Sequence, residues 1–205
     1  MHHSKVKRLH REEAILQSLK KLDYLTTSQI QILHDLKSER NAQRVLKQMS
    51  DYVNVVKQGQ YIYFLNAKGR EIVDCKKVRK STGNFLHFVM RNALYIAYGM
   101  PSNWKNEIKI SSKGATRKDT VVNVADALFK YQDTYHVVEV DNEQSMSNNR
   151  KKIEKYDQLI NRKAFGEVPP VMIWITTTEL RRNQLTDLCS KCGISSQVFT
   201  ANDFI

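Results

Sequence analysis

Hydrophobic residues recur with the period of an α-helix in the first part of the chain. The pattern predicts three helices, at about residues 12–22, 28–36 and 38–49. Two β-prone runs, 53–56 and 61–65, follow on either side of a polar turn that contains Gly59, which predicts a β-hairpin. The first part of the chain is therefore expected to consist of three helices followed by a hairpin.

The second part of the chain mixes helical and strand-like patterns. Helices are predicted at about residues 85–98, 145–161 and 178–191. Strands are predicted at about residues 104–111, 124–131, 136–141, 169–175 and 194–199. The run 169–175 is wholly apolar, as expected of a buried strand in a mixed sheet. The fold class expected for the whole chain is α+β, with a small α/β domain in its second part.

A polar and basic segment, residues 75–83, separates the two parts and is predicted to be a linker. A linker of this composition could itself contact phosphates, or it could have no role beyond connecting the domains. The expected organisation is a first domain at residues 1–74, the linker, and a second domain at residues 84–205.

Basic and acidic residues are unevenly distributed along the chain, and this distribution indicates the kind of partner. The chain has 205 residues and a net charge of +12, and residues 1–80 hold 17 basic and 8 acidic side chains. A strongly basic first half favours a polyanionic partner, most simply nucleic acid. No apolar run reaches the length of a membrane span, and the first residues lack the apolar segment of a signal peptide. A cytoplasmic protein without membrane contact is therefore expected.

Three helices followed by a hairpin is the element order of a winged helix-turn-helix domain. In such domains the third helix enters the major groove of DNA and the wing lies along the phosphate backbone. The candidate DNA-binding residues are Arg40, Gln43, Arg44 and Lys47 on the third helix, and Lys57, Gln58 and Gln60 on the wing. The alternatives are a merely solvated helix face and a winged helix that contacts protein.

Acidic residues gather where the predicted strands 124–131 and 136–141 meet the following helix. Glu139 and Asp141 lie two residues apart and should point to the same face of the sheet. Asp126 and Glu139 on adjacent strands could share a hard divalent cation such as Mg²⁺ or Mn²⁺, and a lysine of the helix could add a positive charge. That arrangement suits metal-assisted hydrolysis of a phosphodiester. The alternative is that the acids face solvent and only increase solubility.

Several short motifs, in this order, resemble the replication-relaxation family of plasmids, phages and other mobile elements of Gram-positive bacteria. They are the wing ending at Gly69, the helix with His87, Ala-Asp126-Ala, the strand Glu139-Val-Asp141 and the helix Lys152-Ile-Glu-Lys-Tyr156. The resemblance covers about residues 10–200. It implies a winged helix joined to a domain similar to PD-(D/E)xK nucleases.

The resemblance also implies roles for individual residues. Asp126 and Glu139 are the expected metal-binding acids, and Asp141 stands where such nucleases usually carry lysine. Lys152 or Lys155 could supply the missing charge, and Glu107 could replace an upstream acid.

The expected function is that of a protein that binds double-stranded DNA in the replication or regulation of a mobile element, with an inactive nuclease-like domain. One alternative is an active metal-dependent endonuclease with Asp126, Glu139, Asp141 and Lys152 as its catalytic residues. Another is a transcriptional repressor that forms a homodimer through its second domain. The sequence leaves open the DNA site, the oligomeric state, the host element and the choice between DNA and RNA.

Overall fold

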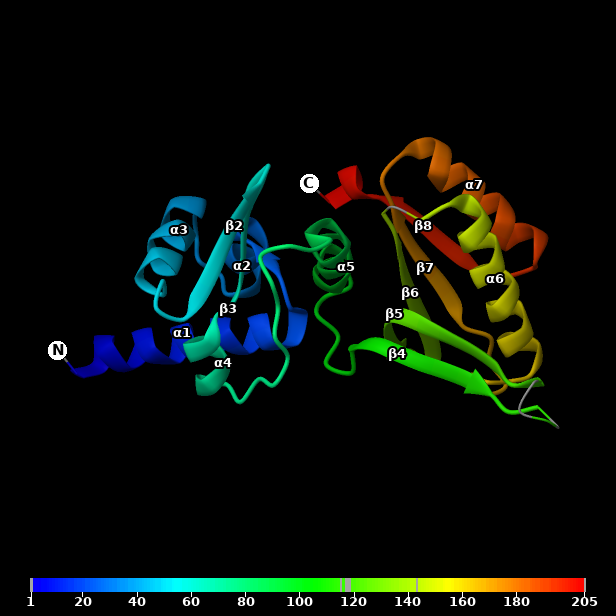
Figure 1. The fold of residues 1–205 in the computed structure, drawn as a ribbon, viewed down its shortest axis with the longest axis horizontal. Coiled ribbons are helices and arrows are strands. Elements are labelled where there is room, and N and C mark those ends of the chain that lie inside the picture. Colours follow the sequence, from blue (N-terminus) through cyan, green and yellow to red (C-terminus); the bar gives the residue numbers. More distant parts are fainter. Residues whose placement is uncertain (1, 115, 117–118, 143, 205) are drawn as a thin grey trace. The chain divides into compact units, whose positions relative to one another are not determined.

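The computed structural model describes residues 2–114, 116, 119–142 and 144–204 and divides into two compact units between Ile96 and Ala97 (Figure 1). Helices and strands occur in both units, so the fold class is α+β, as predicted from the sequence. No helix in the part of the chain that the structure describes has the length and apolar character needed to cross a membrane.

The first unit contains helices and a small antiparallel sheet. Its elements are α1 (His2–Leu22), β1 (Leu25–Thr26), α2 (Thr27–Leu33), α3 (Glu39–Gln48), β2 (Val53–Gln58), β3 (Gln60–Leu65), α4 (Ala67–Ile72) and α5 (Phe85–Ala97). The strand order is β1-β3-β2. Thr26 caps α2 and Ser38 caps α3, each by accepting a backbone N–H with its side chain. The three predicted helices and the hairpin are therefore confirmed.

The first helix is longer than predicted. It begins at His2 rather than near Glu12. Its buried apolar side chains start only at Ile15, so the prediction, which followed the apolar stripe, missed the preceding turns. Arg8 pairs with Glu12 across one turn of this solvated extension, at 3.5 Å.

Helix α5 packs within the first unit, although the sequence pattern places it at the start of the second domain. The Tyr24 ring contacts the rings of Phe85 and Phe88, and the Gln29 side chain donates to the Val89 carbonyl at 2.8 Å. Two polar side chains of α5, Arg91 and Asn92, donate to the Leu22 carbonyl. Because α5 is held by both apolar and polar contacts, the division between units lies after it and not within residues 75–83.

The basic segment before α5 is also attached to the first unit. Lys77 and Arg79 both pair with Asp23, at 3.2 and 2.8 Å. The Tyr24 hydroxyl donates to the Lys80 carbonyl and accepts from the Lys80 N–H. Two of the segment's cationic side chains thus neutralise a buried acid of the same chain.

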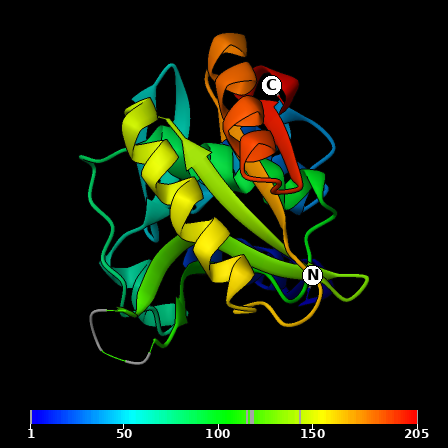
Figure 2. The ribbon, with the colours of Figure 1, turned by 90° about the vertical axis from the view of Figure 1, so that its right-hand side faces the viewer.

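The second unit is a five-stranded mixed sheet with two helices on one face (Figure 2). Its elements are β4 (Lys105–Ser112), β5 (Val121–Tyr131), β6 (Thr134–Asp141), α6 (Met146–Asn161), β7 (Val171–Thr176), α7 (Glu179–Lys191), β8 (Ser196–Thr200) and the 3₁₀ turn η2 (Ala201–Phe204). The strand order is β4-β5-β6-β7-β8, antiparallel from β4 to β6 and parallel from β6 to β8. The predicted mixed sheet is confirmed. Its core lies between the sheet and the two helices, with Tyr156, Trp174 and Leu185 among the buried side chains.

Candidate functional site

Asp126 joins β5 to β6 through its side chain. Backbone pairing between these strands runs from Tyr131 and Thr134 at the turn to Ala127 and Val138. Beyond this point the Asp126 Oδ2 atom accepts the backbone N–H of Val140 at 2.8 Å. The carboxylate therefore takes the place of a main-chain acceptor at the position where the two strands stop pairing.

Glu139 is wholly buried beneath α6, with 0% of its surface exposed. Tyr156 donates its hydroxyl to one carboxylate oxygen, and the Lys152 ammonium group contacts the other. Lys152 and Tyr156 are four residues apart, so they lie on the same face of α6, above β6. We call Asp126, Glu139, Lys152 and Tyr156 the acid–lysine cluster.

The charges of the acid–lysine cluster affect one another. Burial raises the pKa of Glu139 to about 8; Lys152 opposes this rise, and the charge of Asp126 adds to it. Burial also lowers the pKa of Lys152, but the two carboxylates outweigh it, so the pKa is raised. The pKa of Tyr156 lies well above its ordinary value because of burial and the nearby acids. Lys152 thus carries a positive charge beside Glu139 at neutral pH.

Asp141 is equally buried but has different partners. Its Oδ1 atom accepts from Asn149 at 2.8 Å and from Arg181 Nη2 at 2.6 Å. Its Oδ2 atom accepts from Thr176 at 2.8 Å and from Arg181 Nε at 2.7 Å. Burial raises the pKa of Asp141, but the hydrogen bonds and the charge of Arg181 outweigh it and hold the pKa below its ordinary value. Four donors fill the lone-pair positions of this carboxylate, which ties β6 to α6, β7 and α7.

This donor set does not fit a divalent cation as it is arranged. Mg²⁺ and Mn²⁺ require several free oxygen ligands. Asp141 has no lone pair to offer, and the Lys152 ammonium group lies against Glu139, where it would repel a second cation. Among the residues that the structure describes, no three His, Cys, Asp or Glu side chains are grouped to hold a metal. A metal site here would require Lys152 to leave Glu139.

Glu107, the expected upstream acid, lies across from Asp126. Its neighbours on β4, Asn106 and Ile108, pair with Ala127 and Ala125 of β5. The Glu107 backbone has a φ of 54°, a left-handed conformation that is uncommon for a residue other than glycine. The strand is thus locally distorted beside Asp126.

The predicted DNA-binding residues of α3 all lie on its solvent face. Its buried face consists of Ala42, Val45 and Leu46. The exposed side chains are those of Arg40, Gln43, Arg44 and Lys47. Two of them bond to residues of the same helix: Gln43 bonds to Glu39 at 3.0 Å and Arg44 to Asn41 at 2.9 Å.

The predicted wing is the β2–β3 hairpin. Gln58 and Gln60 pair across its tip, where Gly59 has a φ of 71° that favours glycine. Lys57, Gln58 and Gln60 are exposed, and the Lys57 ammonium group lies 5.7 Å from the Tyr61 ring.

The structure thus brings Asp126, Glu139 and Lys152 together but commits Asp141 to a separate set of partners. Lys155, the alternative to Lys152, is exposed, whereas Lys152 is half-buried. Sequence reasoning missed the roles of Tyr156, Asn149, Thr176 and Arg181. Helical spacing from Lys152 could have identified Tyr156, whereas Arg181 lies 40 residues beyond Asp141 and has no local signal.

Comparisons with known proteins identify one similar crystal structure and one matching family. No curated protein matches the chain. The crystal structure of protein VC1899 from Vibrio cholerae is similar, with a TM-score of 0.45 and 15% sequence identity, over 82% of this chain and 40% of that one. This chain therefore spans less than half of that protein's length. The model of the replication-relaxation family matches residues 16–169, which are most of the chain. The chain belongs to the replication-relaxation family.

Proposed function

We propose that this protein binds double-stranded DNA through its first unit, as a winged helix-turn-helix domain, in the replication of a mobile element or its control. The observation that carries the proposal is the solvent face of α3, where Arg40, Gln43, Arg44 and Lys47 are all exposed. Membership of the replication-relaxation family supports a role in replication.

The physical chemistry of α3 suits DNA recognition. Arginine and glutamine can each form two hydrogen bonds to a base edge in the major groove, whereas lysine more often meets phosphate. Capping by Ser38 and the buried Val45 and Leu46 hold the helix in one orientation, so its exposed side chains are presented together. The exposed tip of the β2–β3 hairpin supplies Lys57 for the phosphate backbone.

We propose further that the second unit is a PD-(D/E)xK-like domain that does not cut DNA. The pairing of Glu139 with Lys152 and the saturation of Asp141 support this proposal, since neither acid is free to bind a cation. A likeness to a nuclease fold does not by itself imply cleavage.

The test of DNA binding is the Arg40→Ala/Arg44→Ala double variant. Binding of a labelled duplex is measured by fluorescence anisotropy, and we expect affinity to fall roughly tenfold or more while thermal unfolding stays unchanged. The matched control is Lys163→Ala/Lys191→Ala, which removes two exposed cations of the second unit. Equal affinities of the two double variants would remove α3 from the DNA interface.

An active metal-dependent endonuclease is the second candidate, favoured by the convergence of Asp126, Glu139 and Lys152. Supercoiled plasmid is incubated with the protein in Mg²⁺, Mn²⁺ or EDTA, and mobility shift and cleavage are read together. We expect a shift without cutting. Cutting that requires metal and is lost in Glu139→Gln would establish the enzyme instead.

A further inference from the structure

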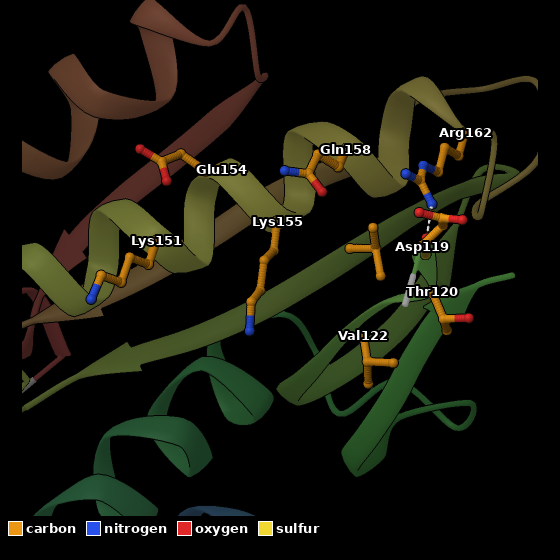
Figure 3. Close-up of a pocket in the computed structure, with 9 residues that line it drawn as sticks. Asp119, Thr120, Val122, Lys151, Glu154, Lys155, Gln158 and Arg162 are labelled. Carbon is orange, nitrogen blue, oxygen red and sulfur yellow. Dashed lines mark hydrogen bonds between the residues drawn. The ribbon is translucent and has the colours of Figure 1, made fainter. Parts of the chain in front are cut away.

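Helix α6 directs polar side chains to two different places. Lys152 and Tyr156 point to Glu139 under the helix. A second stripe lines an open groove between α6 and the start of β5 (Figure 3). The members of this stripe are Lys151, Lys155, Gln158 and Arg162. Their spacing of four, three and four residues keeps them on one side of the helix.

The groove is large and its α6 side is cationic. Its volume is about 640 Å³, and Asp119, Thr120, Val121 and Val122 line it on the β5 side. Arg162 donates to the Asp119 carbonyl, and the Asp119 carboxylate accepts the backbone N–H of Thr116 at 3.1 Å. In Figure 3 Lys155 extends toward the sheet. Glu154 and Asp119 also line this hollow, so three cationic side chains stand against two acids and the lining stays net positive.

A second hollow adjoins the first at β5, on the face of the sheet opposite to α6. It has a volume of about 400 Å³ and shares Thr120 and Val122 with the groove. Lys109 and Lys113 line it, together with Ser111 and Thr116. We call the two hollows together the α6–β5 groove; five lysine and arginine side chains line it, from α6, from β4 and from the residue after β4.

The side chains that line the α6–β5 groove indicate what kind of ligand it binds. None of the described side chains that line the two hollows is aromatic, so the groove offers no platform on which unstacked bases could lie. Exposed lysine, arginine, amide and hydroxyl groups are the usual contacts to phosphate oxygens. From Lys151 to Arg162 the helix rises roughly 16 Å, which is the axial length of about five base-pair steps of duplex DNA.

We propose that the α6–β5 groove is a second DNA contact, which holds the phosphate backbone of a duplex without reading its sequence. This inference rests on the proposed function in that DNA is the partner, but it involves a different unit and different residues. It assigns the two neighbouring lysines of α6 different roles: Lys152 contacts the buried Glu139, and Lys151 joins Lys155 in the groove.

The experiment uses the full chain and measures the salt dependence of its affinity for a labelled mixed-sequence duplex. Each phosphate contact contributes about 0.9 to the slope of log affinity against log salt concentration. In Lys151→Ala/Lys155→Ala the slope should therefore fall by about 1.8, and Gln158→Lys should steepen it by about 0.9. All three substituted residues are exposed, so thermal unfolding should stay near that of the unsubstituted protein.

Lys163→Ala/Lys191→Ala is the matched control because it removes the same charge from exposed positions outside the groove. An equal loss of slope in this control would show a general charge effect and overturn the proposal. An unchanged slope in Lys151→Ala/Lys155→Ala, with weakened binding in Arg40→Ala/Arg44→Ala, would overturn the groove and leave the role of α3 intact. A reduced slope in Lys151→Ala/Lys155→Ala, with unchanged binding in Arg40→Ala/Arg44→Ala, would support the groove and exclude α3 from the DNA interface. Failure of the unsubstituted protein to bind duplex would overturn both.

Discussion

The charged side chains of α3 and those of β6 are placed in opposite ways. Arg40, Arg44 and Lys47 are exposed, and Arg44 bonds to Asn41 on its own helix. Glu139 and Asp141 are both 0% exposed and are paired with side chains of other elements. Exposed charges on a rigid helix are available to an external ligand, whereas the buried acids of β6 are engaged by partners within the fold.

The cost of burying charge explains this difference. An unpaired buried carboxylate costs several kcal/mol, so β6 can carry two acids only where other elements supply donors. Arg181 of α7 and Lys152 of α6 supply the positive charges. Acids arranged like those of an active site can therefore stabilise the packing of helices and strands. Substitutions of three buried acids test whether they contribute to the free energy of unfolding.

The largest effect is expected at Asp23, a buried acid in the unit that we propose binds DNA. It is 4% exposed and pairs with Arg91, which is 0% exposed, at 3.1 Å. Asp23→Ala leaves Arg91 buried without its counter-charge, and the free energy of unfolding should fall by about 3–5 kcal/mol in urea titration. Glu71→Ala, at an exposed position of the same unit, should change it by less than about 0.5 kcal/mol. Similar values for the two variants would contradict a stabilising role for the buried pair.

A smaller loss is expected at Asp141. Asp141→Asn keeps the size of the side chain but removes the charge that Arg181 neutralises, and one acceptor oxygen. We expect the free energy of unfolding to fall by about 2–4 kcal/mol, measured by urea titration. Asp187→Asn, at an exposed position of α7, is the control. If Asp141→Asn kept full stability but abolished a metal-dependent cleavage, Asp141 would be catalytic and the comparison would fail.

The smallest effect is expected for Glu139, as a change in the free energy of unfolding with each unit of pH. Folded Glu139 holds its proton up to a pKa of about 8, against an ordinary value of 4.5. Between these values the folded state binds more protons than the unfolded state, so the free energy of unfolding falls as pH rises, by at most about 1.4 kcal/mol per pH unit. Urea titrations across this range should show the fall in the unsubstituted protein and a flatter profile in Glu139→Gln. Parallel profiles would mean that Glu139 is ionised throughout.

Much of the secondary structure could be predicted because it depends on local patterns. The helical period of 38–49 and the alternation of 136–141 were sufficient to identify α3 and β6. The same patterns placed Arg44 on a solvent face, and Glu139 and Asp141 on one face of a sheet. The start of α1 and the attachment of α5 were not predictable in this way, because the first lacks an apolar stripe and the second depends on contacts with Asp23, Tyr24 and Gln29.

The sequence by itself determined which side chains share a face of a helix or strand, since that follows from periods of 3.6 and 2 residues. It thereby determined the basic face of α3, but it left the choice between Lys152 and Lys155 open, because residues three apart are neighbours on a helix. Only the tertiary structure decided which partner each buried charge received. Asp141 meets Arg181, and Asp23 meets Arg79 and Arg91, across 40 to 68 residues of chain. Such pairs depend on how helices and strands pack, and no local period encodes that packing.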